Sequence, residues 1–274
     1  MEFLMELLRL MDTKGPEPGL YGWYHILWLL IVVVATVCLC RLKPDPRKTL
    51  LVISLAVMVL EIYKQVNFSF SYDGSITFSY QWYAFPFQFC STPMYIGLLA
   101  GLTKPGKLHN SLCAYLASFS LFAGLCVMVY PGDVYVDTVG INIQTMICHG
   151  SMVVQGVYLL HCGYVRPERK TLLRAAGVFS ACVAVAMVLN EVAHATGLLE
   201  EHTFNMFFIS PYCAPSLPVY SLVQQVVPFP ISLVIYIIGF SAAAGIMLLA
   251  AHLIHAGHKK AHRARPVAAG CKAA

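Results

Sequence analysis

Long apolar runs, separated by short polar connections, constrain the fold of this chain more than any other sequence feature. Seven of them approach the ~20 residues that a helix needs to cross a bilayer. Hydrophobic residues make up 58% of the chain and charged residues only 11%, whereas a soluble domain carries roughly 25% charged residues. We therefore predict an all-α, polytopic membrane protein with about seven transmembrane helices. The runs are Tyr24–Leu42, Thr49–Val66, Trp82–Leu102, Leu112–Tyr130, Ile143–Val165, Leu172–His194 and Val226–His255.

Composition divides the chain into three parts. Residues 1–21 mix charged residues with Leu and Met, which predicts an amphipathic, extracytoplasmic segment and not a cleavable signal peptide. Residues 22–256 form a single seven-helix transmembrane domain, and residues 257–274 form a basic, Ala-rich tail. No internal repeat is visible.

The charge of the connections predicts the orientation of the helices. Basic clusters follow the first, third, fifth and seventh runs, whereas the alternate connections carry Asp and Glu and almost no Lys or Arg. The positive-inside rule places the N-terminus outside and the C-terminus in the cytoplasm, and we expect a multi-pass protein of the plasma membrane. The net charge of +5 does not indicate nucleic-acid binding, because the positive residues lie in short clusters between apolar runs.

Several polar residues lie inside the apolar runs, where such groups usually face the bundle interior. A rise of about 1.5 Å per residue places Glu61, Cys90 and His149 at a similar depth in the outer half of the bilayer. His25 and Asn190 are candidates for the same cluster. The alternative for each polar residue is a hydrogen bond between helices, with no chemical role.

The segment Phe85–Pro93 stands out within the third run. Pro86 and Pro93 disfavour a continuous helix, so we predict that the helix restarts near Cys90. A restart would leave free N–H groups beside the sulfur, which favour a thiolate and hold a developing anion. The alternative is a proline kink with Cys90 buried as a small hydrophobic residue.

His149 lies in the fifth run and is a candidate partner for Cys90. Its imidazole would act first as a general base and then as a general acid, and Gly150 permits close helix packing. Cys148 points about 100° away on a helix of 3.6 residues per turn, so we do not expect it in the site. Zinc needs about four ligands, and no second Cys/His spacing of the usual kind appears. We therefore predict neither a metal nor a cofactor.

At these residues the chain resembles the transmembrane-protein-164 / YwaF-type integral membrane family, as a bacterial-looking member. The resemblance covers the chain from about Gly22 to Ile254. One departure is Gln88, which stands where many bacterial relatives have His. The matching motifs are Tyr24-His25, Gln88-Phe89-Cys90-Ser91, His149-Gly150, and Asn205 within a Phe-rich stretch.

The resemblance implies a multispan fold with an intramembrane Cys nucleophile, Cys90, and a His base, His149. Animal members are similar to acyltransferases that move a fatty acyl chain onto an ether lysophospholipid, and related hydrolases use Thr in place of Cys. The expected partner is a membrane phospholipid or lysophospholipid. We expect supporting or substrate-binding roles for His25, Glu61, Gln88, Ser91, Asn190 and Asn205.

The sequence leaves two classes of function open. One is a lipid acyltransferase or lipid-ester hydrolase, which should have a lipid-sized side opening that ends at Cys90 and His149. The other is a non-enzymatic carrier or sensor for a small solute or lipid, with polar residues on both membrane sides of a central cavity. Glu61, Lys64, Glu191 and His194 would then line a translocation route.

Overall fold

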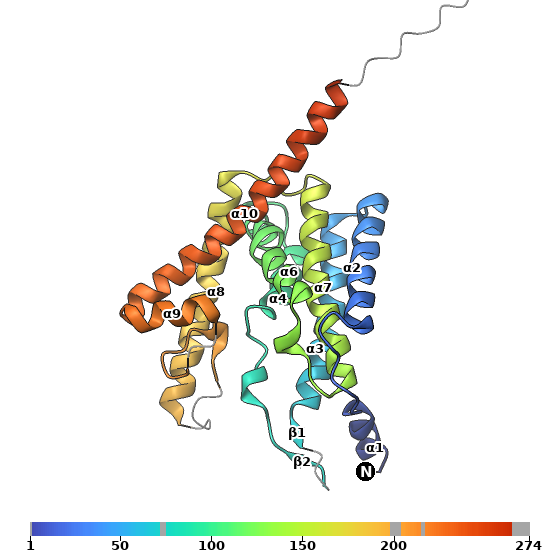
Figure 1. Cartoon of the computed structure of the whole chain (residues 1–274), viewed down its shortest axis with the longest axis vertical. Helices are drawn as coiled ribbons and strands as arrows, with labels where there is room; N and C mark the ends of the chain where they lie inside the picture. The colour runs from blue at the N-terminus through green and yellow to red at the C-terminus, as the bar shows by residue number, and fades with distance from the viewer. Residues whose placement is uncertain (1, 72–74, 198–203, 215–216, 265–274) are drawn as a thin grey trace, which may run out of the picture.

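The computed structural model of the chain is mainly helical and describes residues 2–71, 75–197, 204–214 and 217–264 (Figure 1). Within these residues, six helical segments are long and apolar enough to cross a membrane. This architecture confirms the prediction of an all-α polytopic membrane protein. The six segments are α2 (Trp23–Leu42), α3 (Pro46–Asn67), the continuous run of α5 (Lys107–Tyr115), η2 (Leu116–Ser120) and α6 (Leu121–Val129), then α7 (Val139–His161), α8 (Arg169–Thr196) and α10 (Phe229–Ala264).

The third predicted run, Trp82–Leu102, is not one helix. It begins with the short 3₁₀ turn η1 (Trp82–Ala84), continues as irregular chain, and ends in α4 (Thr92–Leu102). Pro93 lies in the first turn of α4, where proline is tolerated because that N–H has no intrahelical acceptor. The 11 residues of α4 span only about 16 Å at 1.5 Å per residue. The segment before α4 therefore runs through the bundle as turns.

Short elements gather at the end of the bundle that holds the N-terminus (Figure 1). They include the surface helix α1 (Glu2–Met11) and the hairpin of β1 (Phe70–Ser71) and β2 (Thr77–Phe78), in which Phe70 pairs with Phe78. The Tyr63 hydroxyl and the Asn67 amide both donate to the Met11 carbonyl oxygen, which fixes α1 to the end of α3. Three further short elements of the described chain are η3 (Gly132–Val134), η4 (Met206–Phe208) and α9 (Pro218–Val226).

The basic connections meet at the opposite end. Tyr158 on α7 donates to the Pro44 carbonyl oxygen, Arg47 on α3 donates to the Gly101 carbonyl oxygen of α4 at 3.4 Å, and His109 on α5 lies 2.7 Å from the Tyr164 hydroxyl. These contacts place the connections after α2, α4 and α7 side by side. The alternation of charge along the sequence therefore corresponds to the two ends of the folded bundle.

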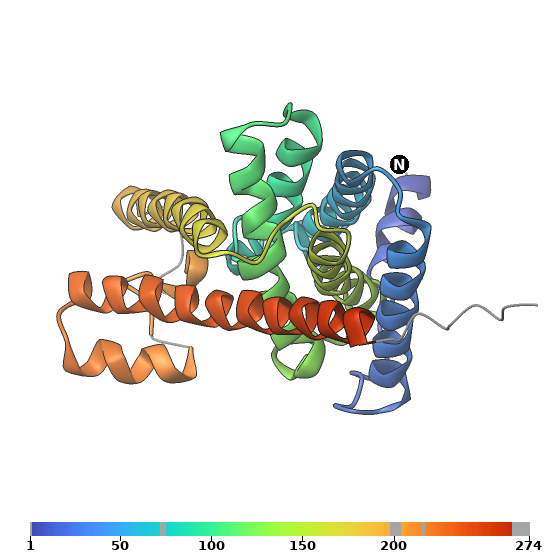
Figure 2. The ribbon, with the colours of Figure 1, turned by 90° about the horizontal axis from the view of Figure 1, so that it is seen from above.

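The last helix, α10, differs from the prediction at its C-terminal end. It crosses the bundle (Figure 2) and rises at an angle from α9 towards the basic end (Figure 1), and it continues to Ala264. The first residues of the predicted tail, 257–264, are therefore helical. Residues 265–274 of that tail lie outside the described residues.

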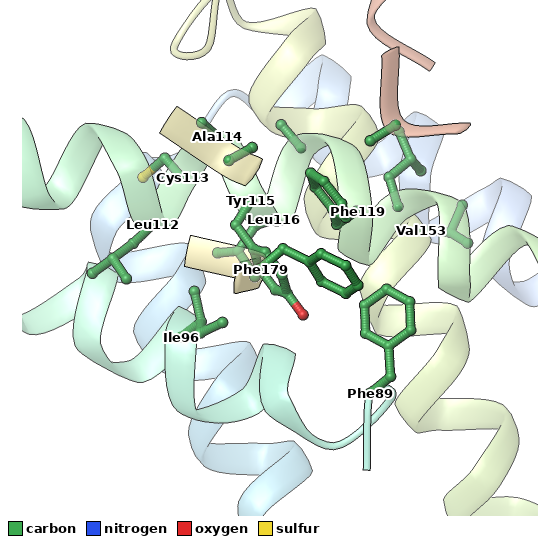
Figure 3. Packing of buried hydrophobic residues seen from close by; sticks show 14 of the residues in the cluster. Phe89, Ile96, Leu112, Cys113, Ala114, Tyr115, Leu116, Phe119, Val153 and Phe179 are labelled. Atoms are coloured by element: carbon green, nitrogen blue, oxygen red, sulfur yellow. The ribbon is translucent and has the colours of Figure 1, made fainter. Parts of the chain in front are cut away.

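Aromatic side chains form the centre of the core (Figure 3). Phe179 of α8 is fully buried, and its ring centroid lies 4.6 Å from that of Phe119 in η2 and 5.3 Å from that of Phe89. Phe89 immediately precedes Cys90, so this packing fixes the turn before α4 in the middle of the bundle. The residues 116–120 form a π-helical turn, a local widening that occurs often at functional sites.

Candidate functional site

Cys90 lies in a tight turn ahead of α4. The N–H groups of Ser91 and Thr92 both donate to the Gln88 carbonyl oxygen, at 2.9 and 3.1 Å, and the buried Ser91 is the N-cap residue of the helix. Two of the amide groups that we expected to be free beside the sulfur are thus already paired. The Cys90 N–H donates to no carbonyl oxygen among the described residues and lies against the part-buried thiol of its own side chain.

Cys148 is the α7 residue that contacts this turn. Its sulfur lies 3.7 Å from the Cys90 carbonyl oxygen, and its side chain packs with Val57 of α3 and Met94 of α4. Cys148, which we did not expect in the site, therefore lies against the Cys90 turn. The side chain of Gln144, one helical turn earlier on the same face of α7, also reaches α3.

His149 is buried beside Cys148 and keeps one ring nitrogen free. Its Nδ1 lies 2.8 Å from the Thr145 carbonyl oxygen. A carbonyl only accepts hydrogen bonds, so Nδ1 carries the proton and Nε2 presents a lone pair. This buried Nε2 has no hydrogen-bond partner, which means that the imidazole is not bonded to the Cys90 thiol. Gly150 follows, and a Cβ there would lie 2.6 Å from a methyl carbon of Val32, in agreement with the predicted close approach of a neighbouring helix.

A buried ionic network lies on the α3 side of the turn. Glu61 is 4% exposed and pairs with Lys64 at 2.7 Å, as the spacing of the two residues predicts. Gln65 and Gln144 donate to the two carboxylate oxygens of Glu61, at 2.8 and 3.2 Å. Tyr80 donates to the Gln65 side-chain oxygen. Burial, followed by the nearby Glu61 carboxylate, raises the pKa of Tyr80 to about 12, so its hydroxyl stays protonated as this donor.

An amide network lies on the other side of the turn, towards α8. Gln88 donates to the Asn205 carbonyl oxygen at 3.1 Å and accepts from the Phe207 N–H at 3.1 Å. Asn190 of α8 makes the same kind of double contact with Met206, at 2.8 and 3.1 Å. The Asn205 side-chain oxygen accepts from the Ser210 N–H at 2.9 Å. Gln88 therefore holds the loop 204–210 against the Cys90 turn, Asn190 holds it against α8, and the Asn205 side chain bonds within the loop.

This loop carries backbone strain at its centre. Phe207 and Phe208 have φ angles of 59° and 57°, a left-handed conformation that costs non-glycine residues on the order of 1–2 kcal/mol each. Phe207 is fully buried, and its ring stacks on that of Phe89 at 5.6 Å. Tyr236 of α10 donates to the Phe207 carbonyl oxygen at 3.0 Å. The strained conformation is thus held by contacts from two helices, α8 and α10, and from the Cys90 turn.

His25 does not join the Cys90 turn. It is fully buried, its Nε2 lies 2.8 Å from the Met128 carbonyl oxygen of α6, and its Nδ1 accepts from the Tyr21 N–H at 3.2 Å. Both ring nitrogens are therefore occupied, and the residue ties α2 to α6. No group of three or more His, Cys, Asp or Glu side chains suited to a metal ion occurs in the part of the chain that the structure describes.

An apolar groove of about 440 Å³ opens between α2, α3 and α7. Its walls include Trp28 and Val32 of α2, Val57 of α3, and Gly150 of α7. Val57 also packs on Cys148, so one wall of the groove is one side chain away from the Cys90 turn. Neither Cys90 nor His149 lines the groove itself.

Two residues near Cys90, Tyr115 and Cys148, were not predicted from the sequence. Tyr115 is fully buried, and its hydroxyl lies 2.8 Å from that of Thr92 in the first turn of α4. Nothing in the sequence around Tyr115 predicts this contact. For Cys148 a signal existed, because Gln144 and Cys148 are four residues apart and share one helix face.

Comparison with known proteins gives one match. A family model described as the TMEM164 family matches residues 20–250, which include every helix from α2 to α9 and most of α10. No curated protein and no solved structure matches the chain.

Proposed function

The chain belongs to the TMEM164 family, and on this premise we propose that it is a membrane enzyme that cleaves phospholipid acyl esters through Cys90. The acyl chain would pass to a lysophospholipid, or to water. The observation that carries the proposal is the buried Nε2 of His149, which has no hydrogen-bond partner. His149 follows Cys148, and Cys148 contacts the Cys90 turn. An unpaired acceptor inside a bundle costs free energy, and a role as general base accounts for it.

Cys90 has the surroundings of a nucleophile. It precedes the N-terminus of α4, where the helix dipole favours a developing negative charge. Its own N–H donates to no carbonyl oxygen within the described chain, and in the proposed mechanism it donates to the oxyanion of the tetrahedral intermediate. Cys148 is packed between Val57 and Met94, with its sulfur on a carbonyl oxygen, an environment that disfavours a thiolate.

The proposed reaction has two steps. The Cys90 sulfur attacks the ester carbonyl carbon while His149 Nε2 takes the thiol proton, and this proton then passes to the departing glycerol oxygen. A thioester and a lysophospholipid result. The hydroxyl of an acceptor lipid, or water, then gives its proton to His149 and attacks the thioester, which restores the thiol. Apo enzymes often hold such pairs loosely, so we expect the two side chains to close on the bound ester.

The apolar groove gives the acyl chain a route from the bilayer. It opens between α2 and α3, both candidate membrane spans, and reaches Val57, which packs on Cys148 beside the turn. Ligand pockets have volumes of roughly 300–1,000 Å³, a range that includes the groove. The chain would lie along α7 with its ester towards Cys90.

The rival function, a carrier or sensor, has less support. Two of the charges that would line a route neutralise each other, since Glu61 pairs with Lys64, and Glu61 also accepts from two amides. Glu191 accepts from the Tyr212 hydroxyl at 2.8 Å, and His194 stacks on the same tyrosine. These contacts account for the residues as parts of the folded structure, so we favour the enzyme.

The test is acyl transfer by the purified full-length protein in lipid nanodiscs. The donor is a phospholipid with an isotope-labelled acyl chain, the acceptor is an ether lysophospholipid, and labelled products and released fatty acid are quantified by mass spectrometry. We expect Cys90→Ala to abolish both products and Cys148→Ala, the matched control, to retain most of the activity. Full activity in folded Cys90→Ala would contradict the proposal.

A further inference from the structure

A second, polar pocket lies at the basic end of the bundle, away from the Cys90 turn. Its volume is about 170 Å³, and it lies between α5, the connection from α7 to α8, and the first turns of α8. The residues that matter here are Asn110 of α5, Tyr164, Arg166 and Glu168 of the connection, and Thr171 and Arg174 of α8.

Two hydroxyl groups of the pocket are already used as donors. The His109 Nδ1–H donates to the Ala100 carbonyl oxygen at 3.0 Å, so Nε2 accepts from Tyr164 at 2.7 Å. Thr171 donates to the Arg166 carbonyl oxygen at 2.7 Å. These bonds fix the walls of the pocket to α4 and α5. The ligand-binding capacity therefore lies in the other side chains.

Arg166 and Arg174 supply that capacity. The ion pairs in the described part of the chain are formed by Lys14 and Lys64, so neither arginine is neutralised by a carboxylate. A guanidinium group binds the oxygens of a phosphate through two parallel N–H bonds, and the Asn110 amide adds a further donor. The first turn of α8, a 28-residue helix, directs its positive dipole end to the same place.

We propose that this pocket binds the phosphate group of an anionic phospholipid from the adjacent leaflet. Basic pockets between transmembrane helices on the cytoplasmic side bind such headgroups, and the positive-inside rule assigns this end to the cytoplasm. The lining carries two positive charges and one negative charge, and this net charge of one unit matches a single phosphodiester. Glu168 is the opposing charge and reduces the affinity.

The experiment measures lipid binding to the full-length protein in neutral detergent by native mass spectrometry. Phosphatidylglycerol is compared with phosphatidylcholine, and inorganic phosphate is added as a competitor. We expect Arg166→Gln and Arg174→Gln each to weaken phosphatidylglycerol binding about tenfold, the usual effect of losing one charge-assisted bond. Glu168→Gln should strengthen it. Arg169→Gln is the matched control, since Arg169 is the first residue of α8, between Arg166 and Arg174 in the sequence, and does not line the pocket.

The competition with inorganic phosphate distinguishes a lipid ligand from a soluble one. If the protein prefers phosphatidylglycerol and millimolar phosphate does not displace it, the lipid is the ligand. If millimolar phosphate displaces the bound phosphatidylglycerol, a soluble phosphate is the ligand of the same site. Arg174→Lys, which keeps the charge without the two-pronged contact, should bind with intermediate affinity. Equal weakening by Arg169→Gln, or no preference over phosphatidylcholine, would overturn the proposal.

Discussion

The sulfur of Cys148 lies 3.7 Å from the backbone carbonyl oxygen of Cys90, and this contact joins α7 to the turn that begins α4. Two cysteines thus meet in the bundle with different surroundings. Cys90 lies at a helix start, and its N–H donates to no carbonyl oxygen of the described chain, whereas Cys148 is packed among apolar side chains. The pair therefore provides its own control for any experiment that modifies one of the two sulfurs.

The two buried histidines should respond differently to substitution. His149→Gln should lower acyl transfer by about 10²–10⁴-fold, the usual contribution of a general base, with little change in thermal stability. His25→Gln should instead lower the unfolding temperature and leave the activity of the folded fraction in place, because both ring nitrogens of His25 bind backbone groups. Transfer rates and melting curves of the two variants distinguish these outcomes.

Gln88 should contribute to stability through the loop 204–210. Gln88→Ala removes two hydrogen bonds to that loop and should cost about 1–3 kcal/mol, since buried groups are left unpaired. Gln88→His should recover part of the loss, because a neutral imidazole also offers one donor and one acceptor. Thermal unfolding in detergent measures both. An equal loss in Gln81→Ala, a control whose side chain accepts from the exposed Tyr83 hydroxyl, would contradict this account.

Gly97 should be intolerant of even a methyl group. A Cβ at this position would lie 2.2 Å from the Ser54 hydroxyl oxygen and 3.2 Å from the Gln155 side-chain oxygen. Gly97→Ala should destabilise the protein by about 1–3 kcal/mol through overpacking, and Ser54→Ala in the same chain should recover much of it. Gly177→Ala, with nothing within 4 Å of the new carbon, should be neutral or stabilising by up to ~1 kcal/mol. Melting temperatures test the series.

The charges of Glu61 and Lys64 should be tolerated or removed together, because removal of one alone should destabilise the protein. Glu61→Gln leaves the Lys64 ammonium without its carboxylate in a mostly buried position, a change that typically costs about 3–5 kcal/mol. Glu61→Gln combined with Lys64→Met removes both charges and should be closer to the wild-type stability. If the double variant unfolds at a lower temperature than the single one, the ion pair does not have this role.

The helices and the break before α4 follow from the sequence, but the arrangement of side chains does not. Apolar runs predict membrane spans because a chain with so few charges must be solvated by lipid, and Pro86 and Pro93 predict the interrupted third run. Which of Cys148 and His149 faces Cys90 depends on the rotation of α7, which packing determines. The bond from Gln88 to Asn205 joins residues 117 positions apart, and no local pattern predicts it.

The most direct test of the account is mass spectrometry of the intact protein and its peptides after incubation with phospholipid and no acceptor. We predict an added mass of one acyl chain on Cys90, which hydroxylamine removes because it cleaves thioesters. The adduct should persist in Cys148→Ala and be absent in Cys90→Ala. An acyl group found on Cys148, or transfer that continues in folded Cys90→Ala without any adduct, would contradict the assignment of Cys90 as the nucleophile.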